Sequence, residues 1–167
     1  MKLSHLSLFL CLLAPSASWA LTSDREQPIY IDSDQQNIDM KSNKVTFTGN
    51  VTLKQGSIHI TADTLIVFRD AKTGELTELQ GYGEPSHFSQ KTDDGKTLKG
   101  QANTLVYKVK DDKLVMTTNA ELHQDDSVIR GKVITYHISS QNLKADGGGK
   151  SGERVSTVIQ PSQLEQK

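Results

Sequence analysis

Cysteine is almost absent from this 167-residue sequence, in which Cys11 is the only one. A chain with one thiol cannot close a disulfide within itself, so its core and its backbone hydrogen bonds must hold the fold together. The charge balance is also slight, with 19 basic against 20 acidic residues, and aromatic residues make up only 5% of the chain. Because no basic stripe with interleaved aromatics is present, we expect no nucleic-acid partner.

Long apolar runs are missing apart from one near the N-terminus. The run from Leu6 to Ala14 is about half the roughly 20 residues that a membrane span requires. It follows Lys2 and precedes the small residues around Trp19, an arrangement typical of a cleavable secretory signal. We predict residues 1–20 as this signal and residues 21–167 as a single domain. Cleavage would remove the only cysteine and leave an exported chain without thiols.

Groups of residues typical of catalysis or metal binding are also lacking. Three pairs of adjacent carboxylates are flanked by Gly, Lys or Ser, which is typical of solvated turns: Asp93-Asp94, Asp111-Asp112 and Asp125-Asp126. The histidines beyond the signal have no zinc-ligand spacing: His59, His87, His123 and His137. Neither a Gly-x-Ser-x-Gly elbow nor a glycine-rich loop that opens a helix occurs. We therefore expect no catalytic residue, no metal site, no cofactor and no enzymatic activity.

Alternation of apolar and polar residues is what the chain does contain. In the stretch from Val45 to Thr61, the apolar residues fall on one parity within each short run. A period of two is typical of strands with one buried face. Polar breaks at Gly49-Asn50 and Gln55–Ser57 tolerate turn geometry. On the same alternation, His59 and His123 point away from their apolar neighbours and should be exposed.

Short segments of this kind recur along the whole domain. We expect about sixteen short strands and no helix, because no window keeps apolar spacing of three and four residues over three turns. Short strands at nearly regular spacing with turn signals predict an all-β sandwich, barrel or roll.

An internal repeat with an offset of 69 residues is also visible. Without a gap, Val45–Gln55 aligns with Leu114–Gln124, and the apolar positions and turns coincide although few residues are identical. Repetition of this kind predicts stacked β units that share one continuous core.

Several segments taken together resemble a known family. These are QPIYIDSDQQNIDM from Gln27, VTFTGNV from Val45, GYGEP from Gly81 followed by Phe88, and RVSTVIQPSQL from Arg154. In this order they resemble the periplasmic lipopolysaccharide export proteins of the organic-solvent-tolerance-like (OstA-like) family, over nearly the whole mature chain. The resemblance implies an open, twisted antiparallel β-jellyroll of about sixteen strands. It also implies a soluble periplasmic protein of Gram-negative bacteria that carries lipid A along its hydrophobic interior.

The partners implied by this resemblance are lipopolysaccharide, the inner-membrane anchored and outer-membrane barrel components of the export machinery, and further copies stacked head to tail. Parity and the resemblance together suggest a set of groove-lining residues. The first choices are Ile29, Ile31, Phe88, Tyr107 and Val109, and the second choices are Phe47, Leu53, Ile60, Val67, Leu105 and Met116. Ordinary core packing is the alternative reading for each of them.

The apolar terminal segments are candidate edges for head-to-tail pairing. The residues expected there are Ile29, Tyr30, Ile31, Val155, Thr157 and Ile159. If the two edges lie at opposite ends of the roll, strand addition between copies would give filaments. Two other functions stay open from the sequence: a single-site lipid carrier that shuttles, and a structural β-repeat module without a small ligand.

Overall fold

The computed structural model describes residues 24–148 and 154–159, and the predicted signal at residues 1–20 lies outside them. The described residues form one antiparallel sheet, preceded by a short 3-10 helix, η1 (Asp24–Glu26). Its strands are β1 (Tyr30–Asp32), β2 (Gln35–Asp39), β3 (Lys44–Gln55), β4 (Ile58–Arg69), β5 (Leu76–Lys91), β6 (Thr97–Lys108), β7 (Lys113–Gln124), β8 (Ser127–His137), β9 (Asn142–Asp146) and β10 (Ser156–Val158). The predicted all-β, antiparallel fold class is thus confirmed. No helix within these residues is long and apolar enough to cross a membrane.

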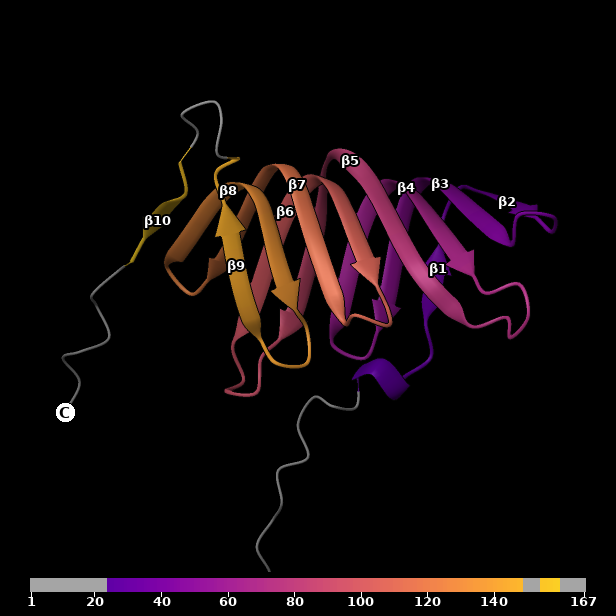
Figure 1. Cartoon of the computed structure of the whole chain (residues 1–167), viewed down its shortest axis with the longest axis horizontal. Coiled ribbons are helices and arrows are strands. Elements are labelled where there is room, and N and C mark those ends of the chain that lie inside the picture. Colours follow the sequence, from indigo (N-terminus) through magenta and orange to yellow (C-terminus); the bar gives the residue numbers. More distant parts are fainter. Residues whose placement is uncertain (1–23, 149–153, 160–167) are drawn as a thin grey trace, which may run out of the picture.

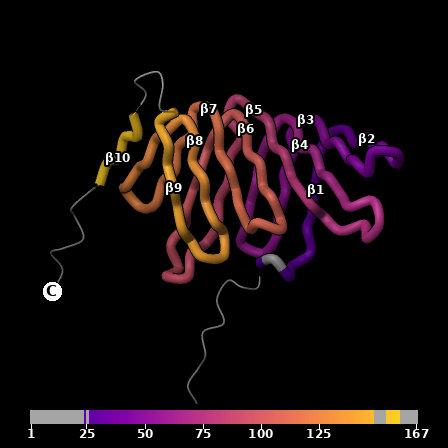
Figure 2. The backbone as a smooth tube through the Cα atoms, in the orientation of Figure 1, coloured from indigo at the N-terminus to yellow at the C-terminus, as the bar shows by residue number. Residues whose placement is uncertain are grey.

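The six long strands β3 to β8 pair in sequence order along the long axis of the molecule (Figure 1). At one end, β1 and β2 both pair with β3, and at the other end β9 and β10 both pair with β8. Figure 2 shows the same succession, with β2 and β10 at opposite ends. Each end of the sheet therefore finishes in two short strands that share one neighbour.

A bend near the middle of each long strand divides the sheet into two walls. The pairing register shifts between Thr48 and Val51 on β3, and matching shifts follow on the next ladders as far as β7–β8. At the β3 bend, Gly49 and Asn50 have φ angles of +83° and +46°. Left-handed residues of this kind bulge and bend a strand without ending it.

The bends explain why the structure has ten strands and not about sixteen. The polar break at Gly49-Asn50 is a bend inside β3, whereas the break at Gln55–Ser57 is a true reversal between β3 and β4. Both breaks use residues that tolerate positive φ, so the sequence alone does not separate them. The two breaks differ in strand pairing, because β3 pairs with β4 on both sides of the bend at Gly49-Asn50, whereas the chain reverses direction at Gln55–Ser57.

Inward-facing side chains of both walls meet in one core. The burial of β4 alternates on each side of its bend and changes parity between Ala62 and Leu65, as expected for a bent strand with one buried face. The buried cluster comprises Phe47, Val51, Leu53, Ile58, Ile60, Leu65, Val67, Leu79, Phe88, Leu98, Ala102, Leu105, Tyr107, Leu114, Met116, Ala120, Leu122, Ile134, Tyr136 and Ile138. The small residues Ala62, Ala102 and Ala120 lie buried next to the register shifts of the bends.

The 69-residue repeat of the sequence is reproduced in the strand pairing. Tyr30 pairs with Lys54 on β1–β3, and their equivalents Lys99 and His123 pair on β6–β7. The short strands β1 and β2 together therefore correspond to β6, while β3 corresponds to β7 and β4 to β8.

The same comparison relates β9 and β10 to the two halves of β5. Thr61 pairs with His87 on β4–β5, and Arg130 pairs with Ser156 on β8–β10 at the same offset. For β9 the loop is five residues shorter: Val67 pairs with Leu79, whereas Tyr136 pairs with Leu143 (79 + 69 − 143 = 5). The molecule thus consists of two four-strand units, β1/β2 to β5 and β6 to β9/β10.

The bends of the two units are held in the same way. Asn50 Nδ2 donates to Asp34 Oδ2 at 2.8 Å, and Asn119 Nδ2 donates to Asn103 Oδ1 at 3.2 Å. Each asparagine reaches the residue 16 positions earlier, and each has a positive φ. Asparagine tolerates the left-handed region and supplies a donor, which accounts for its presence in both copies.

Candidate functional site

The inner surface of the folded sheet is mainly apolar, with Ser86, Gln90 and Thr92 among its few buried polar residues. The predicted groove residues Phe47, Leu53, Ile60, Val67, Phe88, Leu105, Tyr107 and Met116 are buried there, and Ile29, Ile31 and Val109 pack against them half-buried. Their inward orientation follows from the alternation of each strand. Whether they line a ligand groove stays a prediction, since burial in a core and contact with an apolar ligand need the same side chains.

The middle of this interior is tightly packed. Leu105 is 2% exposed, and Met116 and Ile134 are fully buried, so the two walls close on each other there. Space remains at the two ends. The structure therefore separates the predicted residues into a packed centre and a few that reach an open end.

A hollow of about 500 Å³ opens at the β1 end of the interior. Ile29, Leu76 and Val109 supply its apolar lining, with Asp70, Glu75 and Lys110 among the polar residues at its rim. Of the first-choice groove residues, Ile29 and Val109 are the two brought together here, although 80 positions separate them in the sequence. This hollow is a mouth through which an apolar chain could reach the core.

A second hollow, of about 170 Å³, opens at the β9 end. Its apolar lining comes from Leu98, Leu122, Ile129, Tyr136 and Leu143. None of these was among the sequence-predicted groove residues. Their parity within β6, β7, β8 and β9 carries the signal that could have found them, since all but Ile129, which follows Val128, lie between polar neighbours.

Tyr136 connects this hollow to the deep core. Its ring lies 6.1 Å from that of Phe88, at an interplanar angle of 57°, and its hydroxyl donates to Gln90 Oε1 at 3.3 Å. Burial raises the pKa of Tyr136 to about 12, with smaller contributions from Asp112 and Asp93. The hydroxyl therefore stays neutral at physiological pH and forms, with Gln90, a buried polar pair beside the apolar core.

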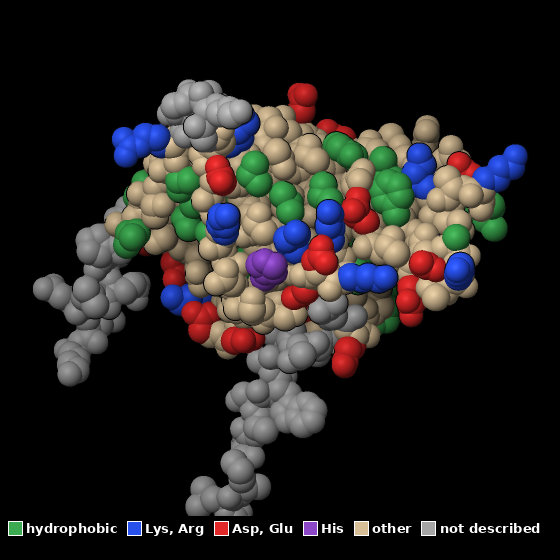
Figure 3. Space-filling view, in the orientation of Figure 1, with side chains coloured by type: hydrophobic (Ala, Val, Ile, Leu, Met, Phe, Trp, Pro, Cys, Tyr) green, Lys and Arg blue, Asp and Glu red, His purple; other side chains and the backbone are tan. Residues whose placement is uncertain are grey.

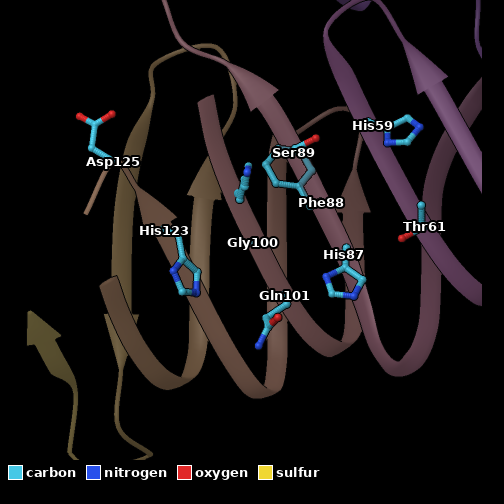
Figure 4. Close-up of a pocket in the computed structure, with 10 residues that line it drawn as sticks. His59, Thr61, His87, Phe88, Ser89, Gly100, Gln101, His123 and Asp125 are labelled. Atoms are coloured by element: carbon cyan, nitrogen blue, oxygen red, sulfur yellow. The ribbon is translucent and has the colours of Figure 1, made fainter. Parts of the chain in front are cut away.

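The outer face carries a separate, polar hollow of about 490 Å³ over β4 to β7 (Figure 4). His59, His87 and His123 line it together with Lys99 and Gln101. Figure 4 shows the three imidazoles on different strands and spread around the hollow. Among the residues that the structure describes, no group of three or more metal-ligating side chains is positioned to hold an ion.

Charges around this outer hollow are largely paired. Glu121 accepts from Arg130 Nε at 2.8 Å and lies 3.1 Å from His123 Nε2, and both contacts help to lower the pKa of the Glu121 carboxyl, the Arg130 bond most of all. Lys96 Nζ lies 2.7 Å from Asp125 Oδ2. His59 and His123, which the sequence predicts to be exposed, are half-buried on this face. On the face that Figure 3 shows, side chains of both charges are interspersed.

The sheet edges are the third notable feature. At the β1/β2 end Tyr30 and Ile38 are 65% and 55% exposed, and at the β10 end Val158 and Ile159 are 42% and 75% exposed. The predicted edge residues Ile29, Tyr30, Ile31, Val155, Thr157 and Ile159 lie at these two ends. Ile38 was not among them. It pairs with Val45 on β3, and among the described strands none pairs with β2 on its other side.

Comparison with known proteins gives consistent matches. The family described as "LptA/(LptD N-terminal domain) LPS transport protein" matches residues 30–142. The lipopolysaccharide export system protein LptA of Haemophilus influenzae is 48% identical over 170 residues, covering 99% of this chain and 98% of that protein. LptA of Escherichia coli K12 is 45% identical over 168 residues, covering 99% of this chain and 90% of that protein.

A solved structure supports the same grouping. The crystal structure of LptH, described as the LptA homologous periplasmic component of the conserved lipopolysaccharide transport device from Pseudomonas aeruginosa, matches with a TM-score of 0.75 and 29% identity. The match covers 83% of this chain and 99% of that one. These relatives carry the names of transport proteins. The family match runs from β1 into β9 and the relatives match end to end, so this chain belongs to the LptA/(LptD N-terminal domain) family of LPS transport proteins.

Proposed function

We propose that this protein binds lipopolysaccharide in the periplasm and carries it, through its lipid A part, from the inner to the outer membrane without catalysing a reaction. The observation that carries this proposal is the inward apolar surface of six consecutive long strands, open at both ends. The names and titles of the relatives, which describe lipopolysaccharide export, support the same function. Residues 1–20 would direct export and be removed.

Acyl chains are the ligand part that suits such an interior. Sheltering one CH₂ group from water is worth about 0.8 kcal/mol, so a chain of about twelve carbons could gain on the order of 10 kcal/mol when fully enclosed. The packed centre implies less than that, because the walls must separate to admit a chain. Weaker binding suits a carrier that must also release its cargo. We place first contact at Ile29 and Val109, which line the larger mouth.

The two open edges of the sheet suggest how copies could form a bridge between the membranes. The strands β1/β2 and β9/β10 lie at opposite ends of the long axis (Figure 1), and no other strand of the described sheet pairs with them on their outer sides. We propose that copies associate head to tail by strand addition. The terminal copies would dock in the same way on the inner-membrane anchored and outer-membrane barrel components of the export machinery.

Photo-crosslinking in cells tests the binding site. A photoreactive residue at Ile29 or Val109 should give adducts that contain lipopolysaccharide, and one at His59 on the outer face should not. Placement at Leu143, in the smaller mouth, tests whether cargo reaches the other end. Adducts from His59 at the same yield as from Ile29 would contradict an interior site.

A charged side chain in the larger mouth, at Ile29, gives a second, quantitative test of the binding site. Ile29→Asp should lower the affinity of purified protein for lipopolysaccharide by at least ten-fold, because a carboxylate would have to be desolvated beside an acyl chain. Thr97→Asp, which adds the same charge at an exposed position on β6, is the matched control and should bind as the wild type does. Unchanged binding by a folded Ile29→Asp variant would remove this residue from the site.

A further inference from the structure

The two ends of the sheet carry different charge. From Tyr30 to Asp39 the N-terminal edge contains Asp32, Asp34 and Asp39 and no basic residue, a formal charge of −3. The described part of the C-terminal edge contains Lys144 and Arg154 against Asp146, a formal charge of +1. The sequence of residues 149–153 adds one lysine and one glutamate, hence no net charge.

These charges are available to a partner. Asp32, Lys144 and Arg154 are all exposed. None of the three forms an ion pair with another described residue. These three charges can therefore face charges of another copy, whereas Asp34 and Asp39 already accept hydrogen bonds within the molecule.

The internal repeat supplies a register in which the two ends would meet. Within the repeat, β9/β10 are equivalent to β5, and β1/β2 are equivalent to β6. Because β5 pairs with β6 inside the molecule, β9/β10 of one copy can pair with β1/β2 of the next in the same register. Phe88 pairs with Gly100 in the β5–β6 ladder, so its equivalent places Thr157 opposite Ile31 of the next copy. Leu79 pairs with Tyr107, which places Leu143 opposite Ile38 and covers that exposed side chain.

In this register the opposite charges come together. Ser156 falls opposite Asp32. Arg154, two residues earlier, corresponds to Pro85 at the register shift of the β5–β6 ladder, so the joint brings it into the neighbourhood of Asp32 and Asp34 without a fixed pairing. Lys144 falls opposite Asn37 and diagonally across from Asp39. Diagonal neighbours on adjacent strands are within reach of long side chains. Pairing two N-terminal edges would instead set three aspartates against three.

We propose that the charge difference between the two edges selects the direction of assembly, with Arg154 and Lys144 of one copy facing the aspartates of β1/β2 in the next. This inference rests on the proposed head-to-tail association and adds what prevents the reverse pairings. Exposed pairs contribute modestly to affinity, so the effect lies mainly in association rate and in rejection of like ends. It should be strongest at low ionic strength.

A charge-swap cycle tests the proposal. Asp32→Lys should place a lysine beside Arg154 and weaken self-association in 50 mM NaCl about five- to ten-fold, and Arg154→Glu should do the same by placing a glutamate beside Asp32. The double variant restores an opposite pair and should associate within about two-fold of the wild type. In 500 mM NaCl the four proteins should converge. Lys108→Glu, an exposed charge in the middle of the sheet, is the matched control and should have no effect.

A disulfide readout separates this inference from the bridge itself. The mature chain has no cysteine, so Ile31→Cys together with Thr157→Cys introduces the only thiols, at uncharged positions that meet in the proposed joint. Disulfide-linked ladders in the wild-type charge background are expected, and their absence would overturn both proposals. Ladders that form equally well in the single and double charge variants would overturn the charge selection alone.

Discussion

Tyr136 shows at the residue scale how a polar group is accommodated inside a mainly apolar core. Its hydroxyl is paired with Gln90, and its ring packs on Phe88. Alternation predicts that residue 136 faces inward. The partner Gln90 could not be predicted, because 46 residues separate the two and only the folded walls bring them together.

The raised pKa of Tyr136 predicts a specific loss of stability in alkali. A tyrosine in the unfolded chain has a pKa near 10, whereas the pKa of Tyr136 in the folded protein is about 12. The neutral side chain therefore stabilises the fold fully below about pH 10, and this contribution, on the order of 2 kcal/mol, is lost as the pH rises toward 12. Denaturant unfolding between pH 8 and pH 11.5 should show the decline.

Tyr136→Phe should flatten that part of the stability curve, even though it lowers stability at neutral pH by leaving Gln90 without its donor. Tyr82→Phe, at an exposed position, serves as the control and should keep the decline. Equal slopes in the wild type and Tyr136→Phe would show that this hydroxyl does not titrate in the fold.

The bends are the informative feature at the scale of the element. The sequence places them correctly as breaks, because glycine and asparagine interrupt the apolar alternation at Gly49-Asn50. It does not show that the strand continues, because that depends on a neighbour about 15 residues away that pairs on both sides of the bend. This is the physical reason for ten strands where short alternating runs suggested about sixteen.

The two copies of the bend differ at one position, and this difference gives a stability prediction. Thr118 occupies the place of Gly49 with a φ of +65°, which costs a β-branched residue about 1 to 2 kcal/mol. Thr118→Gly should therefore raise the free energy of unfolding by roughly 0.5 to 1 kcal/mol, after the entropy of the unfolded glycine is subtracted. Chemical denaturation with an unchanged m-value measures the gain.

The reverse change is the natural control. Gly49→Thr should lower the free energy of unfolding by more than Thr118→Gly raises it, because a Cβ at residue 49 would also collide with the Asp34 carboxylate. If both substitutions shift stability in the same direction, backbone conformation is not what distinguishes the two bends.

For the whole molecule, the open ends matter most. The sequence indicates apolar terminal strands, and the structure places them at opposite ends of one sheet. The pairing of β10 with β8 could not be predicted, because β10 has only three residues and follows a glycine-rich segment with no pattern of its own. The exposure of Ile38 likewise depends on the absence of a further strand beside β2 within the described sheet.

Truncation tests whether the β10 end is needed for assembly. A protein that ends before Arg154 lacks β10 and should sediment as a monomer at concentrations where the full chain forms longer species. Ending the protein after Ile159 keeps β10 and should leave assembly intact. Circular dichroism should show the sheet retained in both, and identical size distributions for the two truncations would argue against strand addition at this edge.

The two-unit construction of the chain has a consequence for movement along such a bridge. If copies join as β5 joins β6, the sheet continues from one molecule into the next without a change in strand pairing. The same four-strand unit then recurs about every 19 Å, given a strand spacing near 4.8 Å. A cargo molecule that moves along the bridge then passes a one-dimensional lattice of similar binding positions, separated by similar energy barriers. Such a lattice has no downhill direction of its own, so net flow would be set by loading at one end and removal at the other.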